Sequence, residues 1–166
     1  MNCSNAIRLL LCTVIAVAIL SSCKGQKNDS LPKPVGYVND FENILSTSEE
    51  RYLDSIIRDF ENRTTNQIAI ITVDTSMVKK TDFDNYILRI FNAWGVGQKE
   101  KNNGIVIGFS RSYRMIRIEN GRGIEKILSN GETKTIVDSA FIPLFKKGLY
   151  FDGVVSGLNA IMQRLR

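Results

Sequence analysis

The chain has 166 residues and a formal net charge of +5; 43% of its residues are apolar and 23% are charged, which suits one packed domain and excludes wholesale disorder. Histidine is absent, which excludes Ser–His and Cys–His nucleophile pairs and histidine metal ligands. The three cysteines all lie within the first 23 residues, so the remainder offers no thiol nucleophile and no disulfide. Any chemistry must come from carboxylates, hydroxyls, amides, lysine and arginine.

The beginning of the chain is apolar and indicates export. Residues 9–20 form a run of 12 residues in which only Thr13 is polar, and a helix of that length measures about 18 Å, short of the roughly 30 Å of a bilayer core. This length is typical of a secretory signal peptide. The small residues before Cys23 resemble the lipobox of bacterial lipoproteins, in which the cysteine is acylated and becomes the mature N-terminus. We expect a signal peptide over residues 1–22 and a lipid on Cys23; the alternative is an ordinary signal peptide followed by a coincidental cysteine.

The next segment predicts a linker. Residues 23–36 contain two of the three prolines, two glycines and few apolar side chains, which is typical of a flexible chain. Several acyl chains on one residue anchor a protein stably, whereas a single chain is marginal. We therefore expect a lipoprotein of the cell envelope that faces the periplasm or the exterior, with its domain over residues 37–166.

The charge is unevenly distributed. Residues 81–166 carry 13 basic and 8 acidic side chains. This surplus suits phosphate groups or an anionic membrane surface, and an ordinary solvated face is the alternative. Because aromatic residues do not alternate with the basic ones, the sequence does not favour nucleic acid as a partner.

The first part of the domain predicts a helix and a buried strand. Ser46 and Glu49 have the spacing of a capping box, and one apolar stripe continues to about Asn62, which predicts a helix. The nearly continuous apolar run over 68–73 is typical of a strand covered on both faces. Residues 37–45, before the helix, are expected to be extended or turning.

The second part predicts two strands and three helices. A helix from Thr81 or Asp82 to Trp94, ended by Gly95, leads to a buried strand over 104–110. The segments that follow are a half-exposed strand over 113–119, a loop at Gly121 and Gly123, a helix over 130–146 that Pro143 breaks or kinks, and a last helix over 150–165. This order predicts an α/β fold: a three-layer α/β/α sandwich with a small mixed sheet in a single domain.

Two glutamates six residues apart flank the predicted glycine loop. If Gly121 and Gly123 let the chain fold back, Glu119 and Glu125 could converge on a hard cation such as Ca²⁺ or Mg²⁺. The spacing fits a glycine loop with two solvated glutamates equally well. A dinucleotide-binding interpretation of the glycines fails, because no clear helix is predicted to follow the strand.

Other charged residues are candidates for the same site. Asp40 and Asp74 are candidate partners because they lie near strand ends, where ligands bind in open α/β sheets, although each also fits an ordinary turn. Arg117 and Arg122 are candidates for holding phosphoryl oxygens, and either aspartate could act on water in a metal-assisted phosphatase. No established phosphatase nucleophile motif is present, so the catalytic residues stay unassigned.

Several segments together resemble one family. They are Val38-Asn39-Asp40 with Leu45-Ser46, residues 88–97 ending in Trp94-Gly95-Val96-Gly97, Asn103-Gly104, Arg117-Ile118-Glu119 with Gly121 and Gly123, and Ile142-Pro143 with Phe145-Lys146-Lys147-Gly148, Tyr150 and Gly153. In this order they resemble the TPM domain, also called the TPM phosphatase domain, over roughly residues 36–162. The resemblance implies an α/β/α sandwich.

The resemblance implies two classes of function. The family includes a thylakoid-lumen protein with acid phosphatase activity and an accessory subunit of acetylcholine receptors, and some bacterial members bind calcium or magnesium. Asn102, Asn130 and Leu149 stand where many members have aspartate, so a cation site here should be weaker. We expect a membrane-anchored, cation-binding accessory or interaction domain for membrane proteins. The alternative is a metal-assisted acid phosphatase that acts on phosphomonoesters.

Overall fold

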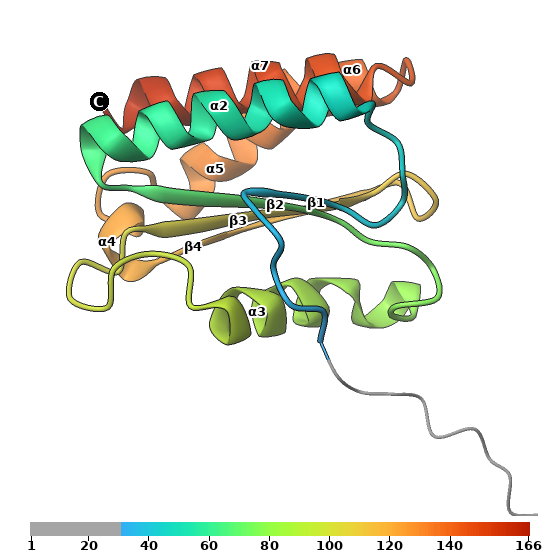
Figure 1. The fold of residues 1–166 in the computed structure, drawn as a ribbon, viewed down its shortest axis with the longest axis horizontal. Coiled ribbons are helices and arrows are strands. Elements are labelled where there is room, and N and C mark those ends of the chain that lie inside the picture. Colours follow the sequence, from blue (N-terminus) through green and yellow to red (C-terminus); the bar gives the residue numbers. More distant parts are fainter. Residues whose placement is uncertain (1–30) are drawn as a thin grey trace, which may run out of the picture. The chain divides into compact units, whose positions relative to one another are not determined.

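The computed structural model describes residues 31–166, and residues 32–166 form one compact unit (Figure 1). The predicted signal peptide over residues 1–22 and the predicted lipidation site at Cys23 lie outside the described residues, as does most of the predicted linker. Among the helices of residues 31–166, none is both long and apolar enough to cross a membrane.

Four strands form the sheet of the compact unit in the order β1-β2-β3-β4. They are β1 (Val38–Asp40), β2 (Gln67–Thr72), β3 (Gly104–Ser110) and β4 (Met115–Asn120). The first three strands run parallel, and β4 pairs antiparallel with β3. The sheet is therefore mixed, and the predicted pairing of the two apolar strands, with a hairpin beyond them, is confirmed.

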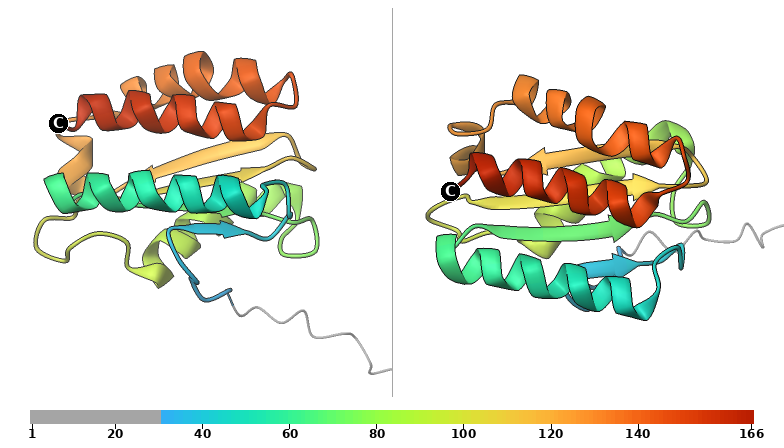
Figure 2. Two further views of the ribbon diagram at one scale, coloured as in Figure 1. Left: turned by 45° about the horizontal axis from the view of Figure 1, so that its top comes forward. Right: turned by 90° about the horizontal axis from the view of Figure 1, so that it is seen from above.

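Helices cover the two faces of the sheet unequally (Figures 1 and 2). One face carries α2 (Thr47–Thr64), α7 (Tyr150–Arg164), and between them in the chain α5 (Asn130–Ile136), the π-helical segment η3 (Val137–Phe141) and α6 (Ile142–Phe145). The other face carries α3 (Phe83–Trp94), which follows the short 3-10 helix η2 (Lys80–Asp82). The predicted three-layer α/β/α arrangement in a single domain is confirmed.

Local signals set the helix ends. The Ser46 hydroxyl accepts the Glu49 backbone N–H at 3.3 Å, and the Glu49 carboxylate accepts the Ser46 N–H at 2.7 Å, so the predicted capping box starts α2. Gly95 has φ of 60° and ends α3 in the left-handed conformation that glycine adopts without strain. Both helix boundaries agree with the sequence prediction.

Two segments differ from the prediction, and a third, predicted to be extended or turning, contains a strand. The predicted helix over 130–146 is interrupted by the π-helical turn η3, because Pro143 has no N–H for the helical ladder and the wider turn before it absorbs the mismatch. The predicted loop at Gly121 and Gly123 contains a short helix, α4 (Arg122–Glu125). Part of the segment 37–45 is the strand β1, whose three residues are too few for a periodic signal.

The core is centred on β3, all of whose residues are buried. Helix α7 packs closely against η3 and α6 because two of its glycines face aromatic rings of those segments. A Cβ at Gly157 would lie 2.0 Å from the Phe141 ring, and one at Gly153 would lie 2.6 Å from the Phe145 ring. These glycines therefore provide the space for two core phenylalanines.

The end of the predicted linker is held on the domain. The Trp94 indole N–H donates to the Pro32 carbonyl at 2.7 Å, and the Val35 N–H donates to the buried Asn39 side chain at 2.8 Å. The prediction that the linker is flexible through residue 36 is therefore wrong for residues 32–36. The proline and glycine content indicated that this segment has no helix or strand, but it could not indicate these tertiary contacts.

Candidate functional site

The carboxyl ends of the three parallel strands bring polar side chains to one edge of the sheet. Asp40 ends β1, and its two carboxylate oxygens accept the Thr72 hydroxyl at 2.6 Å and the Leu45 backbone N–H at 2.7 Å. Thr72, which ends β2, is fully buried. This edge is where ligands bind in open α/β sheets, so it is the first candidate for a functional site.

Glu42 is the buried carboxylate of this edge and is not among the site residues predicted from the sequence. It accepts the Ser110 hydroxyl at 3.2 Å and the backbone N–H groups of Arg111 at 2.7 Å and Ser112 at 3.1 Å. Its own backbone N–H donates to the Thr72 hydroxyl at 2.9 Å. The spacing Asp40-x-Glu42 was the available signal, but β1 was too short to be recognised as the strand that precedes it.

Asp74 follows β2 at the same edge. Its carboxylate accepts the Ser76 backbone N–H at 2.8 Å, which makes a local turn of the kind that aspartate favours. Hydrogen bonds from the side chain and backbone of Ser76 lower the pKa of Asp74 below its ordinary value. The structure therefore places Asp40 and Asp74 at one edge, each with partners inside the chain.

Glu119 and Glu125 lie toward the other end of the sheet. Glu119 pairs in register with Val106, whereas Asp40 is level with Thr72 and Phe109. Three residue rows and three strands separate Glu119 from Asp40, which is about 17 Å at roughly 3.3 Å per residue and 4.8 Å per strand. The prediction that Glu119 and Glu125 share one cation site with Asp40 and Asp74 is therefore wrong.

The glycines between the two glutamates have a structural role. A Cβ at Gly121 would lie 2.3 Å from the Asn102 carbonyl oxygen, and one at Gly123 would lie 2.0 Å from the Lys101 carbonyl oxygen. The Gly123 N–H instead donates to the Asn102 carbonyl at 2.9 Å. These glycines allow two backbone segments to touch, which explains the spacing without a ligand.

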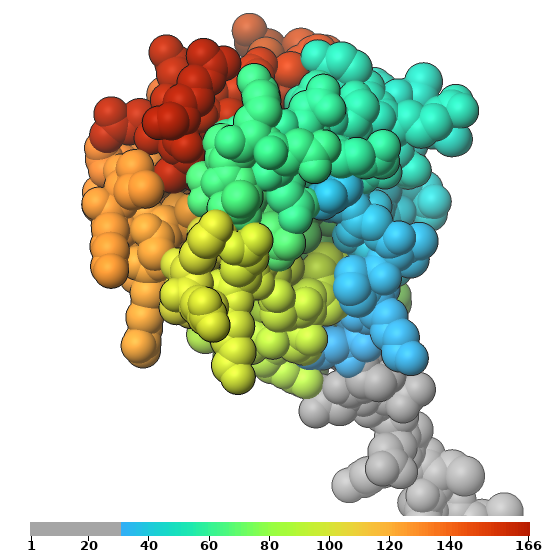
Figure 3. All heavy atoms as spheres, turned by 60° about the vertical axis from the view of Figure 1, so that its left-hand side comes forward, coloured from blue at the N-terminus to red at the C-terminus, as the bar shows by residue number. Residues whose placement is uncertain are grey.

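The loop over residues 95–103 completes this packing. Figure 3 shows the loop between the end of α2 and the segment that contains α4. Asn103 is buried, donates to the Thr65 carbonyl at 2.6 Å and accepts the Gln98 N–H at 2.8 Å. Asn103-Gly104, one of the segments of the family resemblance, is thus a packing motif at the amino ends of β2 and β3.

The predicted phosphate ligands lie in different surroundings. The Arg117 guanidinium donates to the Glu119 carboxylate at 2.7 Å on the face of β4 that α3 covers, and this ion pair raises the pKa of Arg117. Arg122 is exposed at the start of α4, beyond the end of the strand. The structure does not unite them in one anion site.

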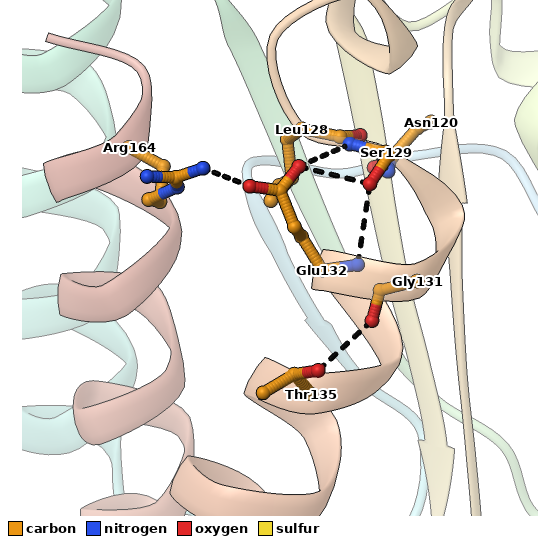
Figure 4. A network of polar contacts seen from close by, with 7 residues as sticks. All are labelled: Asn120, Leu128, Ser129, Gly131, Glu132, Thr135 and Arg164. Atoms are coloured by element: carbon orange, nitrogen blue, oxygen red, sulfur yellow. Dashed lines mark hydrogen bonds and ion pairs between the residues drawn. The ribbon is translucent and has the colours of Figure 1, made fainter.

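A further polar cluster joins the last helix to α5 (Figure 4). The Glu132 carboxylate accepts the Ser129 N–H at 3.0 Å in a second capping box and also forms an ion pair with Arg164 of α7. Asn120 donates to the Thr133 hydroxyl at 2.8 Å nearby. This cluster fixes the start of α5 and is structural.

Within the part of the chain that the structure describes, no three acidic side chains lie close enough together to hold a metal ion. The carboxylates at the carboxyl edge are instead hydrogen-bonded to hydroxyl and backbone donors. A carboxylate has about four acceptor positions, so Asp40 and Asp74 each keep capacity for a further ligand. The edge can take a weakly held, largely hydrated cation but offers no dense ligand cage.

The fold and these motifs define a class of protein: a three-layer α/β/α domain whose glycine pairs pack backbone against backbone beside a mixed sheet. The family model of the TPM domain matches residues 38–164. Because that match spans more than half of the chain, the protein belongs to the TPM domain family. Comparison with curated proteins finds no match.

Solved structures share this fold. An N-terminal domain of a protein from P. gingivalis, solved by NMR, is 27% identical with a TM-score of 0.70, over 78% of this chain and 81% of that one. The BA42 protein from the psychrophilic bacterium Bizionia argentinensis is 24% identical with a TM-score of 0.64, over 75% and 83%. The N-terminal domain of the cg2496 protein from Corynebacterium glutamicum is 12% identical with a TM-score of 0.62, over 82% and 84%.

Proposed function

We propose that this TPM-domain protein is a lipid-anchored accessory or interaction domain of the cell envelope, which serves membrane proteins and binds a divalent cation weakly. The observation that supports it most directly is the hydrogen bonding of the carboxylates at the carboxyl edge. Asp40, Glu42 and Asp74 all accept hydrogen bonds from the chain itself, so they act first as structural groups.

Metal-assisted hydrolysis makes larger demands on a site. It needs an activated water, a positive clamp on the phosphoryl oxygens and an acid for the leaving group. Arg117 is paired with Glu119, and Arg122 lies on a different element, so neither completes such a clamp with Asp40 or Asp74. This separation favours a binding role over turnover.

The alternative is a metal-assisted acid phosphatase. Two observations favour it: the matched family is also a phosphatase family by name, and residues 81–166 carry a basic surplus that would attract phosphate esters. If this alternative holds, Asp74 is the partly exposed carboxylate best placed to hold a hydrated cation at the carboxyl edge.

One set of measurements separates the two functions. The protein, purified from membranes in mild detergent, is titrated with Ca²⁺ and Mg²⁺ by calorimetry and assayed on a phosphomonoester at several pH values. We expect dissociation constants of about 10⁻⁴–10⁻³ M, as in weak extracellular calcium modules, that rise further in Asp74→Asn. Glu125→Gln, an exposed carboxylate at the other end of the sheet, is the matched control.

Turnover decides the outcome. Metal-dependent hydrolysis at about 1 s⁻¹ or faster is on the usual enzymatic scale. If a folded Asp74→Asn variant lost this hydrolysis, the phosphatase function would replace the accessory function. The absence of any calcium or magnesium binding would remove the cation from the proposal.

Anchoring is tested separately. Cys23→Ser should release the protein from the membrane fraction or leave an uncleaved precursor, while Cys3→Ser, within the predicted signal peptide, should leave the mature protein unchanged. A Cys23→Ser protein that is processed and fractionates like the unaltered one would rule out the lipid anchor.

A further inference from the structure

Strand β4 forms one edge of the sheet and has an open side. The Gly121 N–H donates to the carbonyl of Gly104, directly opposite, at 2.8 Å. In an antiparallel ladder, bonded pairs alternate, so Met115, Arg117 and Glu119 bond to β3. The N–H and C=O groups of Ile116 and Ile118 therefore point away from β3, and no strand within residues 31–166 pairs with them.

A groove of about 460 Å³ lies along the beginning of this open edge. Its lining includes Arg114, Ile116, Phe145, Lys146 and Tyr150. Its walls come from three elements, since β4 supplies Ile116, α6 supplies Phe145 and α7 begins at Tyr150. The helices on the sheet face that carries α6 and α7 lie beside β4, and β4 is the strand farthest from β1 (Figure 2).

Aromatic rings make the groove firm and apolar. The Phe145 ring lies 5.0 Å from both the Phe109 ring and the Tyr150 ring, and Phe109 stacks on Tyr150 at 6.3 Å. Phe109 is fully buried in β3, so the ring cluster is fixed to the core. Such a surface suits an apolar side chain inserted from outside.

The rim of the groove is positively charged. Arg114 and Lys146 are exposed and line it, and no acidic side chain does so. Arg114 stands at the end of the turn between β3 and β4 with φ of 54°, which fixes its place beside the first residue of the strand. Acidic side chains on an incoming segment would meet these cations.

We propose that the β4 edge and this groove form a docking site for an extended acidic segment of a partner protein, which adds a fifth strand to the sheet. Main-chain bonds to Ile116 and Ile118 hold the segment, and one of its apolar side chains enters the groove. This inference rests on the proposed interaction function. A second copy is disfavoured as occupant because it brings the same basic rim, and a lipid headgroup lacks the row of alternating donors and acceptors that matches the outward N–H and C=O groups of the strand.

The probe is a synthetic peptide of about eight residues, near the usual strand length, with a valine and glutamates two positions before and after it, so that all three side chains face the groove side. It is titrated into the detergent-purified protein, with binding followed by calorimetry and backbone amide hydrogen exchange by NMR. We expect saturable binding that slows exchange at Ile116 and Ile118 and leaves Met115 and Arg117, already bonded to β3, little changed.

Variants of the protein test the rim. Lys146→Glu should weaken binding about tenfold, because it places a like charge beside the acidic peptide. Lys147→Glu is the matched control, since Lys147 is exposed and adjacent in sequence but does not line the groove. Equal losses in both variants would reduce the effect to general charge attraction and overturn the proposed site.

Variants of the peptide test the strand. Methylation of alternate backbone nitrogens should abolish binding, and exchange of glutamate for lysine should weaken it strongly. Equal binding of the methylated peptide, competition at β4 by anionic lipid vesicles, or a dimer whose β4 amides are protected without peptide would each overturn the proposal. Cross-links to membrane proteins that map elsewhere would then preserve the interaction function while this docking site failed.

Discussion

The Glu42 carboxylate accepts the backbone N–H of Arg111 at 2.7 Å, although 69 positions separate the two residues in the chain. The bond joins the segment after β1 to the turn between β3 and β4, on opposite sides of β2. Because the side chain is buried and accepts two backbone N–H groups of that turn, it ties the segment after β1 to the β3–β4 turn.

Replacement of Glu42 should therefore destabilise the protein. In Glu42→Gln the amide retains one acceptor oxygen but presents an NH₂ group toward backbone donors, which leaves buried N–H groups unsatisfied. We expect a loss of about 1–3 kcal/mol in the free energy of unfolding, measured by urea denaturation. Glu125→Gln, which is exposed, should change stability by less than about 0.5 kcal/mol, and an equally small effect for Glu42→Gln would contradict the structural role.

The glycine in the middle of α7 should tolerate no side chain. Gly157→Ala places a methyl group 2.0 Å from the Phe141 ring, and overpacking of this kind costs about 1–3 kcal/mol. Gly131→Ala in α5, where a Cβ meets nothing within 4 Å, should instead stabilise by roughly 0.5–1 kcal/mol. Thermal unfolding of both variants checks the contrast, and a shift of the same sign in both would refute it.

Gly123 separates the packing interpretation of its loop from a ligand-binding one. Gly123→Ala drives a methyl group toward the Lys101 carbonyl oxygen and should lower stability by at least about 1 kcal/mol. Arg122→Ala, at the exposed neighbouring position, should leave stability unchanged within about 0.5 kcal/mol. If phosphate ions protected the unaltered protein against heat but did not protect Arg122→Ala, the loop would be a phosphate site after all.

The first capping box should make stability depend on pH. Hydrogen bonds from the backbone and hydroxyl of Ser46 lower the pKa of Glu49 below its ordinary value of 4.5. A carboxylate with a lowered pKa stabilises the fold above its unfolded pKa, and this contribution is lost as the pH falls through the folded pKa. Ser46→Ala should therefore cost about 1 kcal/mol near neutral pH.

That cost should shrink once Glu49 is protonated, below about pH 4. Urea denaturation of Ser46→Ala at neutral and acidic pH checks the trend. Ser55→Ala, an exposed serine within the same helix, is the control and should show no such pH dependence. A constant difference at all pH values would mean that the Ser46 hydroxyl does not stabilise the Glu49 carboxylate.

Local signals made most of the fold predictable. Each of these signals lies within a few residues of the element that it predicts: the capping box at Ser46, the glycine at position 95, and the apolar runs of β2 and β3. The π-helical turn was harder to foresee, since Pro143 indicates a disturbance but not the form it takes. The strand β1 is visible only through its pairing with β2.

The candidate site was less predictable because it depends on register. Glu119 and Asp40 are both acidic residues near strand ends, yet β4 runs against the other strands, so the end of β4 lies at the opposite edge. Because β4 is antiparallel, its amino end lies at the carboxyl edge of the three parallel strands. Glu42 was missed for a related reason, since its donors lie in the distant turn at Ser110 and Arg111.

The bond between Trp94 and Pro32 also determines how mechanical load enters the domain. A pull on the N-terminal chain reaches α3 and the short strand β1 first, because residues 32–36 are held there. Strand β4 lies three strands from β1, about 14 Å at roughly 4.8 Å per strand, but α3 packs directly on β3 and β4. Tension from a tether upstream of Pro32 would thus reach both edges of the sheet, β1 through residues 32–36 and β4 through α3.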